Sequence, residues 1–232
     1  MISIIIPTYN EENGIGNIIK KLKLSSDANS INEIIVSDGG SIDNTVDEAQ
    51  RAGAQVIKCT RKGRAAQMNY GASFAKSEVL YFLHADSIPP KNFVNEILSE
   101  IQKGFSCGCY RLRFDIDHWF LKFNCWFTRF DSNYVRFGDQ SLFVTKEVFE
   151  KAGGFREDLL LMEDQEIIHR LKKYGKFKVM NDFVITSARK YLDNGVYRMQ
   201  GIFYRIWAMY YLGYSQEQML KLYRRLIRKS KL

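Results

Sequence analysis

Tyr81-Phe82-Leu83-His84-Ala85-Asp86 is an apolar stretch of β-strand character that ends in a short acidic turn. A carboxylate at the carboxyl end of a buried strand sits where an open α/β sheet forms its ligand crevice, so Asp86 is a candidate metal ligand. An ordinary loop aspartate is the alternative, and it would be preferred if Asp86 stood alone. A second strand, residues 34–37, also ends in an acidic glycine-rich turn, which begins with Asp38. Two such strand ends predict a binding site.

Strands and helices alternate around these two turns. Residues 3–6 are mostly β-branched and predict a strand, and the apolar residues after it recur at helical spacing: Ile15, Ile18, Ile19 and Leu22. The alternation continues with strands over 34–37, 55–59 and 79–83 and with helices over 45–51 and 65–75. Strands separated by helices of about ten residues predict right-handed βαβ units in a parallel sheet. The expected fold class is therefore α/β, a Rossmann-like, mostly parallel sheet flanked by helices.

The second half of the chain shows a less regular pattern. A helix over 92–102, strands over 109–114 and 141–144, and a helix over 146–152 are expected. Between them, six aromatic residues recur with spacings of three and four: Trp119, Phe120, Phe123, Trp126, Phe127 and Phe130. This spacing indicates one face of a helix, for which core packing is the favoured interpretation and an acceptor-binding or lipid-facing surface is the alternative.

A further helix is expected after Met162, and its first turn holds Glu163, Asp164 and Glu166. Acidic residues in a first turn complement the helix dipole, so capping alone would explain all three. No internal repeat or low-complexity linker interrupts the chain. We therefore expect one α/β domain over residues 1–194 and a helical, basic extension over residues 195–232.

The charge balance favours an anionic partner. The 232 residues carry a formal net charge of +8, which suits a nucleoside diphosphate or a phospholipid surface. Nucleic acid is not expected, because no recognised nucleic-acid motif appears. From position 221 onward there is no acidic residue and there are six basic ones: Lys221, Arg224, Arg225, Arg228, Lys229 and Lys231.

Cysteine usage and hydropathy indicate a cytoplasmic protein. The four cysteines lack paired spacing, which argues against a zinc site and for reduced thiols. The N-terminus enters a strand without the pattern of a signal peptide, and the uncharged stretch between Arg205 and Glu217 is too short to span a bilayer. The C-terminal segment that contains this stretch and the basic tail could lie on an anionic bilayer, close over an acceptor site or form a homodimer face. The apolar residues of this segment are Ile202, Phe203, Ile206, Trp207, Met209, Tyr210 and Tyr211.

Five segments in a fixed order resemble the family 2 glycosyltransferases, inverting nucleotide-sugar enzymes of the GT-A fold. They are IIIPTYNEE at 4–12, VSDGGSIDNT at 36–45, GRAAQMNYG at 63–71, HAD at 84–86, and GGF at 153–155 followed by Glu163-Asp164. Within the family, the chain is most similar to a small subgroup associated with radical-SAM and selenium-domain proteins. That similarity rests on HAD in place of Asp-x-Asp and on the segments at 138–140, 161–164 and 186–189.

The resemblance implies a role for each matching residue. Pro7, Thr8 and Glu11 would shape the nucleoside pocket, Asp38 would accept from the base, and Arg64 would meet the diphosphate. A solvated charge on a helix face is the alternative for Arg64.

Metal binding and catalysis are implied in the same way. Asp86 would hold Mg²⁺ or Mn²⁺ against the diphosphate, although His84 stands where the family more often has Asp, which leaves the choice of metal open. Asp164 would act as the base that removes the acceptor proton. Asp139 and Gln140 fall where family acceptor sites are built, with turn formation as the alternative.

The resulting expectation is transfer of a single sugar, with inversion, to an unknown and possibly lipid-linked hydroxyl acceptor. The Q-x-x-R-W signature of processive synthases is absent. A sugar-phosphate nucleotidyltransferase is one alternative, but the first strand is not followed by a glycine-rich loop carrying Arg and Lys. A non-catalytic nucleotide-sugar-binding protein is the other.

Overall fold

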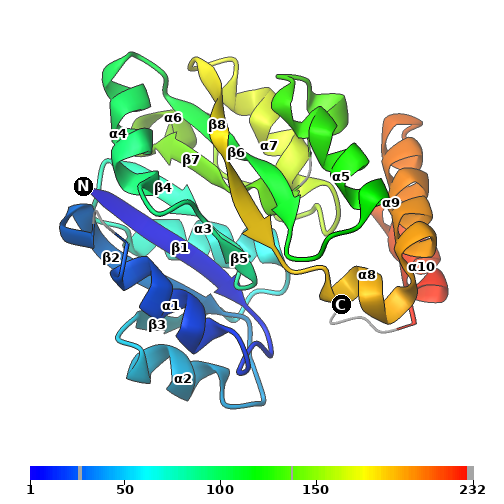
Figure 1. The fold of residues 1–232 in the computed structure, drawn as a ribbon, viewed down its shortest axis with the longest axis horizontal. Helices are drawn as coiled ribbons and strands as arrows, with labels where there is room; N and C mark the ends of the chain where they lie inside the picture. The colour runs from blue at the N-terminus through cyan, green and yellow to red at the C-terminus, as the bar shows by residue number, and fades with distance from the viewer. Residues whose placement is uncertain (26–27, 137, 229–232) are drawn as a thin grey trace.

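The computed structural model describes residues 1–25, 28–136 and 138–228, and its first half alternates strands and helices as expected (Figure 1). The strands are β1 (Ile2–Thr8), β2 (Ile31–Asp38), β3 (Gln55–Lys58), β4 (Val79–Phe82), β5 (Ser87–Ile88), β6 (Cys107–Phe114), β7 (Leu142–Thr145) and β8 (Phe177–Thr186). The first helices are α1 (Ile15–Lys23), α2 (Thr45–Arg51), α3 (Arg64–Phe74), α4 (Phe93–Gln102) and α5 (Trp119–Trp126). The later helices are α6 (Lys146–Lys151), α7 (Glu163–Leu171), α8 (Arg189–Asn194), α9 (Val196–Tyr211) and α10 (Gln216–Leu226). Short 3₁₀ turns lie at η1 (Ala28–Ser30), η2 (Phe127–Arg129), η3 (Asn133–Val135) and η4 (Gly138–Gln140).

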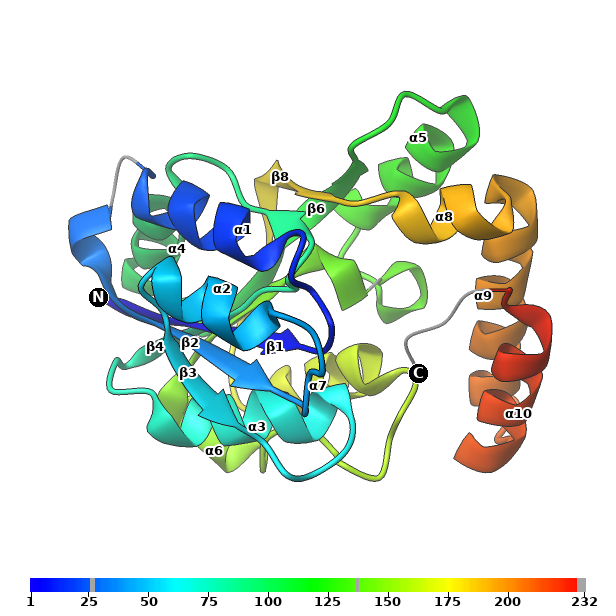
Figure 2. The ribbon, with the colours of Figure 1, turned by 90° about the horizontal axis from the view of Figure 1, so that it is seen from below.

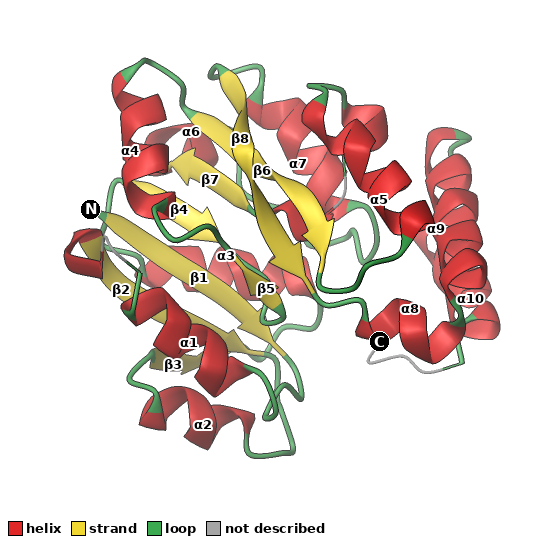
Figure 3. Ribbon diagram, viewed as in Figure 1, coloured by secondary structure: helices red, strands yellow, loops and turns green. Residues whose placement is uncertain are grey.

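The strands of the described residues form one mixed sheet in the order β3-β2-β1-β4-β7-β6-β8-β5 (Figure 3). The first four of these strands run parallel, with β1 between β2 and β4. Strand β7 pairs antiparallel with both β4 and β6, whereas β6 and β8 are parallel. The expected α/β class and the mostly parallel sheet are confirmed.

Helices cover both faces of the sheet because its strands are apolar on both sides. Along β1, Ile4 and Ile6 belong to one core and Ile5 to the other. The first core also contains residues of α1, α2 and α4, and the second contains residues of α3, α6 and α7. Figure 2 shows α1 and α2 on one side of the sheet and α3 and α6 on the other.

Two strands, β5 and β8, were not predicted. Strand β8 pairs with β6 over most of its length, and β5 pairs with the end of β8. The pairing of β5 with the end of β8 places the segment after Thr186 next to Asp86. The Ser187 N–H donates to the Asp86 carbonyl at 3.1 Å. The strand predicted over 109–114 is part of β6, which begins at Cys107 and pairs with β8.

The aromatic segment contradicts the core-packing interpretation. Helix α5 ends at Trp126, earlier than the aromatic spacing suggested, and η2 continues the chain. Leu121, Asn124 and Thr128 are the buried residues of this segment. The side chains of Trp119, Phe123, Trp126 and Phe130 are exposed.

The C-terminal helices α8 to α10 pack at one end of the sheet (Figure 1). Ile202 and Ile206 of α9 are buried in the core shared with β1 and α1, so these two side chains cannot contact a bilayer while α9 is docked. Arg224, Arg225 and Arg228 are exposed, and Lys229 and Lys231 lie outside the described residues. No helix within the described ranges combines the length and apolar character that crossing a bilayer requires. The division at residue 194 falls between α8 and α9 and stays a prediction.

Candidate functional site

Three of the predicted site residues lie at the carboxyl edge of the parallel strands. Thr8 ends β1 and stands opposite Asp38, which ends β2. Asp86 follows the end of β4, on the other side of β1. Neighbouring strands lie about 4.8 Å apart, so this edge gathers side chains from three adjacent strands within roughly 10 Å.

Asp38 organises the turn that follows β2. Its Oδ2 accepts from the N–H groups of Gly40 and Ser41, both at 3.0 Å, and its Oδ1 accepts from the Ser41 hydroxyl at 2.5 Å. The Thr8 hydroxyl lies 3.4 Å from the same Oδ1. The carboxylate is thus held rigidly by its own loop, and a nucleoside base that donates to Asp38 would share oxygens that already accept.

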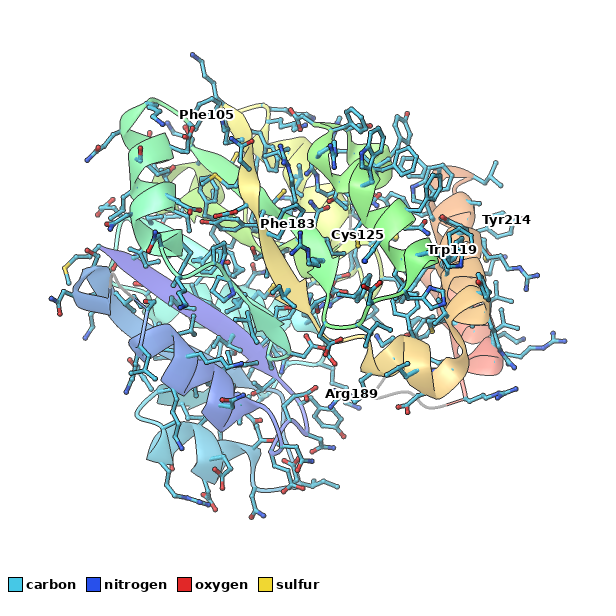
Figure 4. All side chains as sticks on the ribbon, in the orientation of Figure 1. Phe105, Trp119, Cys125, Phe183, Arg189 and Tyr214 are labelled. Atoms are coloured by element: carbon cyan, nitrogen blue, oxygen red, sulfur yellow. The ribbon has the colours of Figure 1, made fainter. Side chains whose placement is uncertain are left out.

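Glu11 begins the segment that follows Pro7 and Thr8, and its N–H donates to the Thr45 hydroxyl at 2.7 Å. Its carboxylate lies 3.2 Å from Arg189 Nη2. Arg189 stands at the start of α8 (Figure 4), so this ion pair joins the first strand loop to the C-terminal helices. The sequence motif at 186–189 contained Arg189, but its partner was not predicted.

Arg64, the first residue of α3, is held by acidic residues from α7. Its Nε donates to Glu163 Oε1 at 2.6 Å, and its Nη2 lies 3.4 Å from Asp164 Oδ2. Its Nη1 lies 3.4 Å from His84 Nε2. The neighbouring carboxylates raise the pKa of Arg64 against the opposing effect of burial. The guanidinium is therefore fixed at Nε and directs its two outer nitrogens toward Asp164 and His84.

His84 and Asp139 form a further ion pair of the site. The distance from His84 Nδ1 to Asp139 Oδ1 is 2.9 Å. Burial and Arg64 would lower the pKa of His84, but Asp139 and Asp164 outweigh them and raise it. Burial would raise the pKa of Asp139, but its contact with His84 outweighs this and lowers the pKa to about 2. Both shifts have their cause in the attraction between the imidazole and the Asp139 carboxylate.

Asp86 lies among charges of both signs. Burial and the nearby carboxylates of Asp139 and Glu11 raise its pKa, while His84 and Arg189 oppose the rise. Repulsion among neighbouring carboxylates is the condition that a bound dication relieves, and hard cations prefer carboxylate oxygens. Within the described ranges, however, no three His, Cys, Asp or Glu side chains converge as a metal cage. Asp86 therefore fits a dication as a single protein ligand, with both nitrogens of His84 already in contact with neighbours.

The structure brings Asp139 into this site but turns Gln140 away from it. The Gln140 side chain is buried, and its Nε2 donates to the Tyr110 carbonyl at 2.9 Å. Gln140 thus fixes η4 against β6 in the interior. Glu163 is the member of the site that sequence reasoning assigned only to capping. The sequence indicated a site role for Glu163 only through its position next to Asp164, because its partner Arg64 lies 99 residues earlier.

Two cavities on the described surface lie away from these carboxylates. One of about 470 Å³ lies along α7 and α9 and is lined by Asn133, Tyr134, Gln165, Glu166, His169, Lys172, Tyr210 and Tyr211. Another of about 320 Å³ lies between the end of α1 and the start of α4. The site at the strand ends is accordingly defined by its ion pairs and not by either cavity.

The fold has counterparts among solved structures at low sequence identity. The mannosyltransferase PcManGT from Pyrobaculum calidifontis, solved with GDP-Man and Mn²⁺, is 16% identical with a TM-score of 0.72, over 97% of this chain and 69% of that one. TarS 1–349 of S. aureus is 15% identical with a TM-score of 0.66, over 85% of this chain. Glucosyl-3-phosphoglycerate synthase from Mycobacterium tuberculosis, solved with Mg²⁺ and UDP, is 17% identical with a TM-score of 0.58, over 81% of this chain and 69% of that one.

These similarities show a GT-A-like fold with C-terminal helices, and the chain spans 63% of the TarS fragment's length. No curated protein matches the sequence. The family model described as glycosyl transferase family 2 matches residues 3–158, which is most of the chain, and includes the ends of β1, β2 and β4. The chain therefore belongs to glycosyl transferase family 2.

Proposed function

We propose that this protein transfers a single sugar from a nucleoside-diphosphate sugar to a hydroxyl acceptor with inversion at the anomeric carbon. One observation carries the proposal: Arg64 is held by Glu163 next to both Asp164 and His84, at the edge of the sheet where Asp86 lies. A cation and a candidate base are thus in contact beside His84, and Asp86, the candidate metal ligand, follows His84 by two residues. The structures similar in fold were solved with GDP-Man, UDP and UDP-GlcNAc, which supports a nucleotide-sugar donor.

The donor would lie along the ends of β1, β2 and β4. Pro7, Thr8 and Glu11 would line the nucleoside pocket, and Asp38 would accept from the base while it holds its loop. Arg64 would bind the diphosphate through its outer nitrogens, which requires its Nη2 to exchange Asp164 for a phosphate oxygen. Asp86 would hold Mg²⁺ or Mn²⁺, which when bound supplies positive charge against the leaving diphosphate.

Asp164 would remove the proton of the acceptor hydroxyl as that oxygen attacks the anomeric carbon. The bond to the diphosphate breaks on the opposite face, and Arg64 stabilises the negative charge that develops on the leaving group. Asp139 stays a candidate for acceptor contact through its position beside His84. For Gln140, the buried amide supports turn formation more than acceptor contact.

Two finer expectations stay proposals as well. Membership of the subgroup associated with radical-SAM and selenium-domain proteins rests on the motifs at 84–86, 138–140, 161–164 and 186–189 alone. A lipid-linked acceptor would suit the basic surface of α10, where Arg224, Arg225 and Arg228 are exposed.

Asp164→Asn is the direct test. A positioned general base contributes about 10²–10⁴-fold, so this variant should lose transfer by that factor while it still binds donor. Thermal stabilisation across a panel of nucleotide sugars with Mn²⁺ identifies the donor and measures its binding. Asp47→Asn is the matched control, because Asp47 also lies in a first helical turn, that of α2, but outside the site.

The outcomes separate the alternatives. Nucleoside diphosphate as the released product supports sugar transfer, and pyrophosphate would support nucleotidyl transfer instead. Normal turnover of Asp164→Asn would overturn the assignment of the base. Donor binding without transfer or hydrolysis under any divalent metal would favour a non-catalytic binding protein.

A further inference from the structure

Helix α5 and the 3₁₀ turn η2 that follows it expose a stripe of aromatic side chains to solvent. Trp119, Phe123, Trp126 and Phe130 are spaced by four, three and four residues and are 67%, 57%, 46% and 45% exposed. Positions at this spacing share one helix face. A run of four large exposed aromatic residues is a contiguous apolar patch, and patches of this kind on soluble proteins mark interaction surfaces.

The patch is built as a fixed surface. Trp126 packs edge-on against Phe130 with ring centroids 5.1 Å apart, and Phe127 packs against both Trp126 and Phe123 at 5.1 and 5.2 Å. The opposite side of the segment is anchored, since the Thr128 hydroxyl accepts from the Leu112 N–H at 3.1 Å. The aromatic side chains are therefore held outward by the packing beneath them.

Helix α9 extends this surface at the Trp119 end. Tyr197 lies 6.5 Å from the Trp119 ring and 5.0 Å from the Phe120 ring, centroid to centroid. Tyr204 lies two helical turns after Tyr197 on α9, and its hydroxyl donates a hydrogen bond to Oδ1 of the buried Asn124 side chain of α5. Both tyrosines are exposed, and Figure 4 shows Trp119 beside α9.

The charge around the patch is positive. Residues 118–130 and 196–211 contain no Asp or Glu. They contribute exposed Lys122, Arg129 and Arg205, and the Arg129 guanidinium lies over the Trp126 ring at 4.6 Å. Acidic residues flank the segment at both ends: Asp117 pairs with Lys122 at 2.6 Å, and Asp131, next to Phe130, pairs with Arg136 and Lys172. The balance remains cationic, in line with the net charge of +8.

We propose that this patch, Trp119, Phe123, Trp126 and Phe130 with Tyr197 and Tyr204, docks the protein on an anionic phospholipid bilayer. Tryptophan and tyrosine have an apolar body and a polar tip, which suits the boundary between headgroups and acyl chains. The neighbouring cations are attracted to anionic headgroups, each strengthening binding by about fivefold. A twofold pair of chains would bring Arg129 and Arg205 of each copy toward the same positive surface, so charge favours the bilayer over a second copy.

Co-sedimentation of the full chain with vesicles tests this surface. The wild-type protein should pellet with phosphatidylcholine vesicles that contain phosphatidylglycerol and much less with phosphatidylcholine alone. Trp119→Ser/Phe123→Ser should weaken binding to anionic vesicles at least about tenfold, because it removes two of the large apolar groups. Lys122→Gln/Arg129→Gln should weaken it by a similar factor and remove most of its dependence on salt.

Leu24→Ser/Tyr174→Ser is the matched control, since both side chains are exposed and lie outside the patch. It should bind anionic vesicles like the wild type, and circular dichroism should show all variants folded. Failure of the wild type to bind vesicles, or equal binding by the patch and control variants, would overturn the proposal. So would a dimer that the patch variant dissociates without any vesicle binding. Donor stabilisation is measured without lipid, so its outcome stays independent of this one.

Discussion

Replacing Glu163 by Gln tests whether a buried carboxylate holds Arg64 in its working position. The contact from Arg64 Nε to Glu163 Oε1 is 2.6 Å, with side-chain exposures of 40% for Arg64 and 1% for Glu163. Burial raises the pKa of Glu163, and the charge of Arg64 opposes that rise. The substitution keeps the shape of the side chain and removes the negative charge that binds the guanidinium.

The expected loss of stability follows from the burial of the two partners. Breaking a buried ion pair costs about 3–5 kcal/mol of unfolding free energy, and an exposed pair contributes about 0–1 kcal/mol. Because water solvates part of Arg64, we expect a loss between these limits, about 2 kcal/mol. Glu163 Oε2 is buried with no partner among the described residues, so an amide N–H there would also lack an acceptor. For a chain of this length the loss lowers Tm by about 4–8 °C.

Thermal denaturation followed by circular dichroism measures this shift, and turnover of the donor measures its consequence. We expect turnover to fall roughly tenfold or more, because Arg64 would no longer be fixed beside Asp164. Glu147→Gln is the matched control: Glu147 pairs with Lys151 at the same 2.6 Å, but the two side chains are 71% and 56% exposed. That variant should leave Tm and turnover unchanged. Equal Tm shifts in the two variants would refute the argument that burial gives the Arg64–Glu163 pair its weight.

The remaining predictions concern packing and pH. Gly108→Ala should lower stability by about 1–3 kcal/mol, because a Cβ there would lie 2.5 Å from Phe143 Cζ and against the Lys178 carbonyl. Gly201→Ala in α9, where no atom lies within 4 Å of the new Cβ, should raise stability by about 0.5–1 kcal/mol. Urea denaturation measures both, and a Gly108→Ala protein as stable as the wild type would contradict this packing. Burial raises the pKa of Cys107 to about 12 and of Cys109 to about 11, so neither thiol should react with a disulfide reagent at pH 8 until the chain unfolds. Since the unfolded thiols ionise first, these two groups lower stability as the pH rises above about 8.5, and equal reactivity of native and unfolded chains would refute their burial.

The first half of the fold was predictable because its local signals agree. The apolar residues of α1 recur at helical spacing, and Ile15, Ile18, Ile19 and Leu22 are all buried. The helix predicted over 45–51 is α2 (Thr45–Arg51). Such agreement of periodicity, turns and element length is what makes the alternation of strand and helix readable from the sequence.

Strand β8 escaped prediction because its pattern is interrupted. Val179 pairs with Cys109, but Phe183 pairs with Arg111, so β8 has two residues more than β6 in this interval. The extra length falls at Asn181 and Asp182, a polar pair that resembles a turn in the sequence. In the structure it is a bulge, and Asn181 accepts from Arg111 Nη2 at 3.0 Å. The pairing with β6 identifies β8 as a strand, although its own sequence pattern is interrupted at the bulge.

In the candidate site, too, some residues were predictable from local sequence patterns and others were not. Strand ends and motifs pointed to Asp38, Asp86 and Asp164, whereas the roles of Glu163 and His84 depend on partners far away in the chain. A carboxylate in a first helical turn is fully explained by the helix dipole until the residue opposite it is known. The residue opposite Glu163 is Arg64. Because Arg64 lies outside α7, the spacing of residues within α7 could not predict this contact.

Helix α5 shows most clearly what periodicity leaves open. The spacing of Trp119, Phe123, Trp126 and Phe130 establishes that they share a face, but not whether that face meets the sheet or the solvent. Here the buried face has polar members, Asn124 and Thr128, whose hydrogen bonds to Tyr204 and Leu112 offset the cost of burying them. Because these polar groups bond β6 and α9 in addition to carbonyls of their own segment, their face lies against the protein and the aromatic face lies toward solvent. An apolar stripe is then a surface feature in need of a partner, and the cations beside it limit which partner that is.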